Sequence, residues 1–140
     1  MSDRDKVLAV VNEWVVKAEN DLLNASHTLK MGARCPTDTV CFHAQQCIEK
    51  YMKALLVLEN VDFPKTHDLE EITALLPARM HLSLSSEEQG KLTEYATGAR
   101  YPGWGPIPLA EARRAVTLAR RVRKEARRLL PKGALQRRTP

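Results

Sequence analysis

The sequence predicts an all-α protein, an up-and-down antiparallel bundle of about five helices, three long and two short. Apolar residues recur at steps of three and four in nearly every segment, which is the period of a helix that buries one face. No segment sustains the alternation of apolar and polar residues that a half-buried strand shows. Because long helices joined by short loops pack in antiparallel order, these segments predict a bundle.

The two longest helices are expected in the first half of the chain. The first spans about residues 5–31, and Gly32 follows it in the position of a C-terminal cap. Its apolar stripe consists of Val7, Val11, Trp14, Ala18, Leu22, Ala25 and Leu29. The second spans about residues 37–60, and Thr37 or Asp38 can accept hydrogen bonds from the free amides of its first turn.

Three further helices are expected in the second half. Thr66 or Asp68 caps a short helix that ends before Pro77. A capping-box pattern at Ser86–Gln89 opens another helix that runs to about residue 97. The last long helix begins after Pro108, which suits the first position of a helix, and it ends at Pro131.

Length and composition favour a single domain. The 140 residues are expected to form one helical domain over residues 1–131, followed by a basic, disordered tail at residues 132–140. No apolar run reaches the ~18 residues of a membrane span, so we expect a cytoplasmic protein without membrane contact. Cys35, Cys41 and Cys47 are odd in number and lack CxxC spacing, which favours free thiols over disulfides.

The net charge of +5 conceals a strong asymmetry along the chain. Residues 109–140 contain 11 Lys and Arg against two acidic residues, whereas residues 1–108 contain 11 basic and 15 acidic residues. One side of the last helix carries Arg113, Arg120, Lys124 and Arg127. This side can follow a nucleic-acid backbone, or it is an ordinary solvated helix face. No aromatic residues interleave with these cations, which argues against reading of single strands by stacking.

The second helix carries two lysines that can bind an anion. Lys50 and Lys53 are three residues apart and can hold one anion between them, unless they only form a solvated face. His43 and Cys47 have the four-residue spacing of metal ligands on a helix. The chain offers no two further ligands at helpful spacing, so no metal site is predicted.

A second anion-binding candidate precedes the short helix after residue 65. Lys65 and His67 lie next to a helix N-terminus, where backbone amides point outward and the helix dipole favours a phosphate. Capping alone also explains the pattern. In that interpretation Lys65 is exposed, Thr66 caps the helix, and His67 packs or bonds a carbonyl.

The third candidate lies in a loop over residues 98–108 whose three prolines and three glycines exclude a regular element. Arg100 can form a bidentate clamp on a phosphate, with Tyr101 as a stacking surface beside it. Alternatively, Arg100 pairs with an acidic residue and bridges the preceding helix to the bundle. A single site requires Arg100 to lie within about 15 Å of Lys53 or Lys65.

Four segments, in this order, resemble the HEPN domain family (higher eukaryotes and prokaryotes nucleotide-binding). They are residues 14–22, FHAQQCIEKYMKALL at 42–56, KTHDL at 65–69, and ARYP at 99–102, within a resemblance that covers about residues 10–125. The resemblance implies a stand-alone prokaryotic HEPN protein of the nucleotidyltransferase-associated type. It further implies an all-α homodimer that works with a minimal nucleotidyltransferase in a toxin–antitoxin-like or stress module.

The resemblance and the candidate residues together predict a regulatory partner that binds a nucleotide, such as ATP or GTP, or a phosphate. RNase branches of the family carry an Arg followed by four to six residues and a His. No Arg in this chain is followed by such a His, which argues against enzymatic activity because the proton-transfer group is missing. Two alternatives stay open: an RNase-type toxin acting on RNA through a different site, and a module that binds nucleic-acid backbones through the last helix.

Overall fold

Residues 1–136 are described by the structure, a computed structural model, and they form five α-helices and four short 3₁₀ turns without a strand. The helices are α1 (Asp3–Leu29), α2 (Thr37–Leu58), α3 (Leu69–Leu75), α4 (Ser86–Ala96) and α5 (Leu109–Leu129). The all-α prediction, with three long and two short helices, is confirmed. Within residues 1–136, none of the helices has the length and apolarity needed to cross a membrane.

The helix starts follow from side chains that satisfy free amides. Ser85 and Glu88 form the capping box of α4, one residue before the position that the spacing predicts. Asp68 caps α3 by accepting hydrogen bonds from two amides, which decides between the two predicted caps. The N-cap of α2 is Pro36, which has no capping side chain, and Oδ1 of Asp38 accepts a hydrogen bond of 2.9 Å from the amide of Thr39. Of the two residues predicted to accept from the first turn of α2, Asp38 therefore satisfies one free amide.

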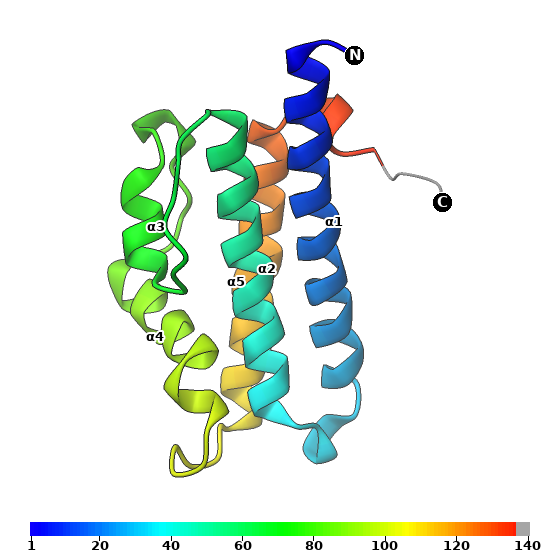
Figure 1. Ribbon diagram of the computed structural model, residues 1–140. Coiled ribbons are helices and arrows are strands. Elements are labelled where there is room, and N and C mark those ends of the chain that lie inside the picture. The colour runs from blue at the N-terminus through cyan, green and yellow to red at the C-terminus, as the bar shows by residue number, and fades with distance from the viewer. Residues whose placement is uncertain (137–140) are drawn as a thin grey trace.

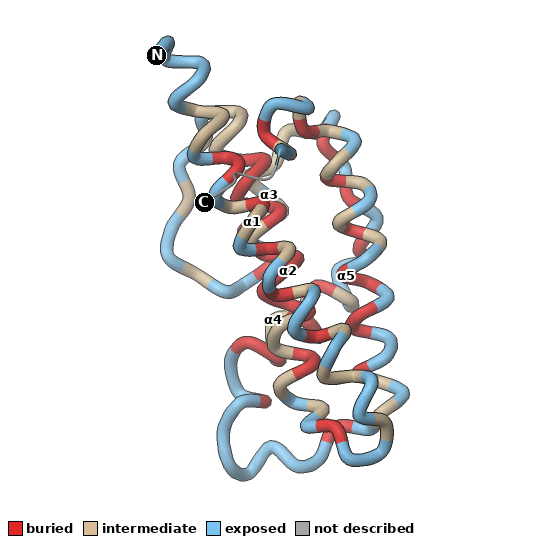
Figure 2. The backbone as a smooth tube through the Cα atoms, turned by 90° about the vertical axis from the view of Figure 1, so that its right-hand side faces the viewer, coloured by how far each residue is buried: buried red, intermediate tan, exposed pale blue. Residues whose placement is uncertain are grey.

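Helix α2 is the centre of the bundle because it contacts all four other α-helices. Figure 1 shows α1 on one side of α2, α3 and α4 on the other, and α5 packed behind it, with α1, α2, α4 and α5 alternating in direction. Buried and exposed positions alternate along α5, as Figure 2 shows, since this helix covers α2 with only one face. The arrangement accounts for the almost continuous burial of α2 from residue 44 to residue 56.

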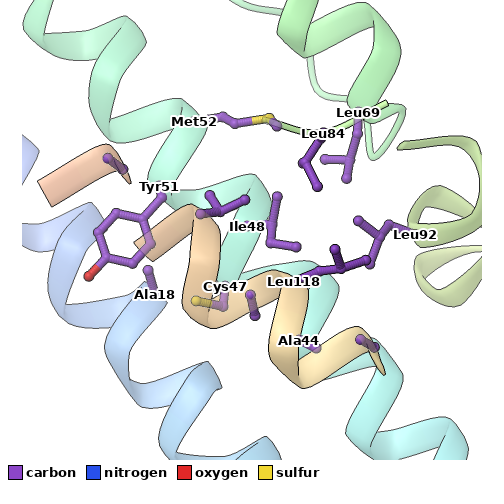
Figure 3. Packing of buried hydrophobic residues seen from close by; sticks show 14 of the residues in the cluster. Ala18, Ala44, Cys47, Ile48, Tyr51, Met52, Leu69, Leu84, Leu92 and Leu118 are labelled. Atoms are coloured by element: carbon purple, nitrogen blue, oxygen red, sulfur yellow. The ribbon is translucent and has the colours of Figure 1, made fainter. Parts of the chain in front are cut away.

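The core consists of side chains that α2 directs to both sides. Ile48 and Met52 pack among leucines of α3, α4, α5 and the segment before α4, whereas Tyr51 points toward α1 (Figure 3). The three cysteines are free and buried, as predicted. Burial raises the pKa of the Cys41 thiol to about 12, so this thiol is protonated and unreactive at neutral pH.

The chain stays ordered beyond the predicted end of the domain. Residues 132–136 were expected to belong to a disordered tail, but Lys132–Ala134 forms a 3₁₀ turn and Ala134 is fully buried. Asn12 of α1 holds this turn: its Nδ2 donates to the carbonyl oxygens of Ala134 at 2.9 Å and Gln136 at 2.6 Å. The buried side-chain amide of Asn12 on α1 therefore orders this segment, whose own composition predicts disorder. The remaining residues of the predicted tail, 137–140, lie outside the described residues.

Candidate functional site

The loop between α4 and α5 lies at the end of the bundle where α2 begins (Figure 1). Thr37 at the start of α2 donates a hydrogen bond of 2.7 Å to the carbonyl oxygen of Ile107, which fastens the loop to the bundle. Gly103 and Gly105 have φ angles of 97° and 93°, a conformation that L side chains rarely adopt. These two glycines let the loop turn back to α5 over a few residues.

Arg100 stands over the ring of Phe42, an α2 residue. The guanidinium carbon lies 4.2 Å from the ring centroid, a cation–π contact. No carboxylate or other acceptor among residues 1–136 forms a hydrogen bond or ion pair with this guanidinium, which is exposed. The alternative in which Arg100 bridges two helices by an ion pair is therefore wrong. The N–H groups of Arg100 are free to bind an anion.

A cleft of about 500 Å³ opens beside Arg100. One wall is the start of α2, including Pro36 and Asp38. The other is the loop from Ala99 to Ile107, of which Trp104 does not line the cleft. Tyr101 lines this cleft with 62% of its surface exposed. Trp104 is also exposed and packs against Gly98, where a Cβ atom would lie 3.0 Å from the indole. Sequence reasoning did not select Trp104, although an aromatic residue in a Gly/Pro loop is a recognisable signal.

Lys50 lies elsewhere, at the interface of α1 and α2. Its Nζ is 2.5 Å from Oδ2 of Asp21, and Nδ1 of His43 is 2.8 Å from the other oxygen of the same carboxylate. Asp21 is 10% exposed, so its charge is largely shielded from water, and Lys50 compensates it. His43, which has the spacing of a metal ligand relative to Cys47, is instead a hydrogen-bond partner of Asp21. Residues 1–136 hold no cluster of three or more potential metal ligands.

Lys53 and His67 meet at a carboxylate that sequence reasoning did not select. Glu49 accepts hydrogen bonds from Lys53 Nζ at 3.0 Å and from Gln45 Nε2 at 3.1 Å, and His67 Nδ1 lies 2.8 Å from its Oε1. A carboxylate accepts hydrogen bonds, so Nδ1 of His67 is the donor in this contact. The pair of Glu49 and Lys53 at i and i+4 within an apolar helix was the available signal.

The ammonium of Lys53 is enclosed by aromatic rings as well. Its Nζ lies 5.6 Å from the ring centroid of Trp14 and 5.5 Å from that of Phe63, and these two rings meet edge to face. The lysine thus ties α1 and the segment after α2 to the buried Glu49. Such a fully engaged cation stabilises the fold and is a poor anion receptor.

The six anion-binding candidates therefore fall into several separate groups. Arg100 stacks on Phe42, and Lys53 lies eleven residues farther along the same helix, about 16 Å at the rise of an α-helix. Lys65 is exposed on the segment before α3 and forms no ion pair with any residue from 1 to 136. The structure unites Lys53 with His67 and Arg100 with Tyr101, and it leaves Lys50 on Asp21.

The predicted basic face of α5 is partly tied to the neighbouring helix. Nε of Arg123 donates to both oxygens of Glu19 at 3.0 and 2.8 Å, and Nη1 of Arg127 lies 3.7 Å from the same carboxylate. Tyr51 also donates to Glu19, at 2.8 Å. Burial by itself raises the pKa of the Glu19 carboxyl, but the hydrogen bonds from Arg123 and Tyr51 outweigh it and lower the pKa below its ordinary value.

The lowered pKa of Glu19 predicts an acid-dependent loss of stability. A carboxyl whose pKa falls on folding stabilises the protein above its ordinary pKa of 4.5, and this contribution is lost as the pH falls below that value. We expect Glu19→Gln to unfold about 1–3 kcal/mol more easily at pH 7. Thermal unfolding from pH 7 to pH 3 should show the difference from the wild type shrinking below about pH 4.5. Glu13→Gln, at an exposed and unpaired position of α1, should show no difference at any pH.

The fold defines the class of protein: a helical bundle in which a long central helix carries buried polar groups and an arginine-bearing loop closes one end. The HEPN domain family matches residues 11–129, and the chain belongs to this family. The protein TT1696 from Thermus thermophilus has a similar structure, with a TM-score of 0.71 and 24% sequence identity over 87% of this chain and 99% of that chain. This likeness supports the fold. Among curated proteins the sequence has no significant match.

Proposed function

We propose that this HEPN protein is a regulator that binds the phosphate groups of a nucleotide, such as ATP or GTP, in the cleft beside Arg100. The observation that supports the proposal is the stacked guanidinium of Arg100, which has no acceptor among residues 1–136 and lies at a cleft of about 500 Å³. Small-molecule sites have volumes of about 300–1,000 Å³, so the cleft has a suitable size for a mononucleotide.

The chemistry of the cleft suits a nucleotide in two respects. Phosphate oxygens match the fork of N–H donors that Arg100 presents, and a bidentate contact of this kind is among the stronger hydrogen-bonded pairs in proteins. The exposed ring of Tyr101 supplies a surface on which a base can stack.

We further propose the partners that the family resemblance implies. These are a second copy of the chain and a minimal nucleotidyltransferase, within a toxin–antitoxin-like or stress module. Exposed apolar side chains on and just after α1, namely Val10, Leu23 and Met31, supply apolar surface for such contacts. Light scattering of the purified protein tests the homodimer, and co-expression with a neighbouring nucleotidyltransferase tests the second partner.

Calorimetric titration with ATP, GTP and AMP tests the nucleotide site. We expect Arg100→Ala to weaken binding about ten- to hundredfold, since it removes one or two charge-assisted hydrogen bonds. Arg4→Ala, an exposed arginine in the first turn of α1, is the matched control and should bind like the wild type. Thermal unfolding of each variant checks that the fold is intact.

Three other outcomes have distinct meanings for this proposal. Loss of binding in Lys65→Ala but not in Arg100→Ala would move the site to the segment before α3 and overturn it. The proposal would also be overturned if none of the three nucleotides binds. Cleavage of mixed RNA by the wild type, lost in Arg100→Ala, would replace regulation by the RNase-type alternative.

A further inference from the structure

The cations of α5 differ in whether an acidic group compensates them. Glu88 of α4 pairs with Arg114 at 2.8 Å and with Arg121 at 3.3 Å. Glu19 of α1 pairs in the same way with two further arginines of α5, those at positions 123 and 127. Each flank of α5 thus shares one carboxylate of the neighbouring helix between two arginines.

The remaining cations form a row along the outward face of α5. This uncompensated row consists of Arg113, Arg120, Lys124 and Arg128. All four are exposed, and none pairs with an acidic residue among residues 1–136; Arg120 contacts only the hydroxyl of Ser26, at 3.3 Å. At about 100° per residue the four fall within an arc of about 80°, and they span about 22 Å along the helix axis. The row differs from the predicted one because Arg127 is engaged by Glu19 and Tyr51, and Arg128 takes its place.

We propose that the uncompensated row is a docking surface for the phosphate backbone of a nucleic-acid duplex, read without regard to sequence. A duplex carries a phosphate charge about every 1.7 Å of its axis, so 22 Å of helix faces a dense line of anions. Between residues 113 and 128 the arc holds only these cations and Thr117. It therefore lacks the aromatic rings on which single-stranded bases stack, and the apolar centre that a protein partner requires.

This surface is separate from the proposed nucleotide site. The row lies on the outward side of α5, whereas Arg100 stacks on α2 in the loop before α5. Failure of one proposal therefore leaves the other standing. Arg100→Ala should bind duplex like the wild type, and a variant of the row should bind nucleotide like the wild type.

Fluorescence anisotropy tests the proposal. The probes are a 20-base-pair DNA duplex, the matching RNA duplex and a single strand, each measured between 50 and 200 mM salt. Four phosphate contacts predict that the logarithm of the affinity falls with that of the salt concentration with a slope of about −3.6. The double variant Arg113→Gln/Lys124→Gln should halve the slope to about −1.8 and weaken binding more than tenfold at 100 mM salt. Comparison of the two duplexes shows which nucleic acid is preferred.

The matched control removes the same charge from another surface. Lys6→Gln/Lys17→Gln alters two exposed and unpaired lysines of α1 that lie about 140–160° around the helix axis from Glu19, the residue that faces α5. This control should keep the wild-type slope. An equal loss in the control would show an effect of net charge alone and overturn the proposal. Absence of duplex binding at 50 mM salt, stronger binding of the single strand, or equal competition by polyglutamate would each overturn it as well.

Discussion

Replacing Glu49 with leucine is expected to lower the free energy of unfolding by about 3–5 kcal/mol, because it leaves the ammonium of Lys53 without its carboxylate. The side chain of Glu49 is 3% exposed and that of Lys53 is 11% exposed, so water does not replace the lost partner. The substitution also removes the acceptor that holds His67 and the segment before α3. For a domain of this size, the loss corresponds to a fall of roughly 10–20 °C in the melting temperature.

Two comparison variants make the Glu49 experiment specific. Glu59→Gln removes an ion pair with Arg79, whose side chain is 63% exposed, and it should cost less than about 1 kcal/mol. The double variant Glu49→Leu/Lys53→Met replaces the buried pair by apolar side chains and should recover most of the lost stability. Urea unfolding followed by circular dichroism measures all three. A single variant as stable as the wild type would show that Glu49 does not compensate Lys53.

Replacing Tyr51 with alanine is the second large effect that we expect, about 3–5 kcal/mol of unfolding free energy. The side chain of Tyr51 is fully buried and points from α2 toward α1 (Figure 3), so its removal leaves a large cavity between helices. Its hydroxyl donates to Glu19 at 2.8 Å and accepts from Arg127 at 3.3 Å. Burial, together with its hydrogen bond to Glu19, raises the pKa of this hydroxyl, which therefore remains a donor across the physiological pH range.

Tyr51→Phe separates packing from hydrogen bonding. The ring and its contacts remain, so we expect a loss of only about 1 kcal/mol from the missing hydroxyl. Midpoints of urea unfolding for the two variants give the comparison. Equal losses in both would mean that the hydroxyl and its contacts with Glu19 and Arg127, rather than the packing of the ring, carry the contribution of this residue.

The helices could be predicted from sequence because local signals and apolar periodicity agree in each of them. Pro108 and Pro131 flank the last helix, and Ser85 with Glu88 caps α4 within one residue of the predicted position. The order at residues 132–136 could not be predicted. It depends on hydrogen bonds from Asn12, more than 120 residues away, and on burial of Ala134.

The candidate site was predictable only in part. Arg100 and Tyr101 are neighbours in the chain, so their common location follows from sequence alone. Lys53 pairs with Glu49 and contacts two aromatic rings. The rings belong to α1 and to the segment after α2, which meet Lys53 only in the folded bundle. The same holds for Arg127, predicted on the basic face, which pairs with Glu19 of α1 in the folded bundle.

The sequence by itself determined the fold class, the helix positions, the free thiols and the concentration of positive charge on α5, since each of these depends on residue type and on spacing within one segment. Only the tertiary structure decided which charges are free. A carboxylate and a cation neutralise each other over a few ångströms, and such distances between helices are set by packing. For this reason Arg100 and the uncompensated row on α5 are available to anions, whereas Lys50, Lys53 and Arg127 hold the bundle together.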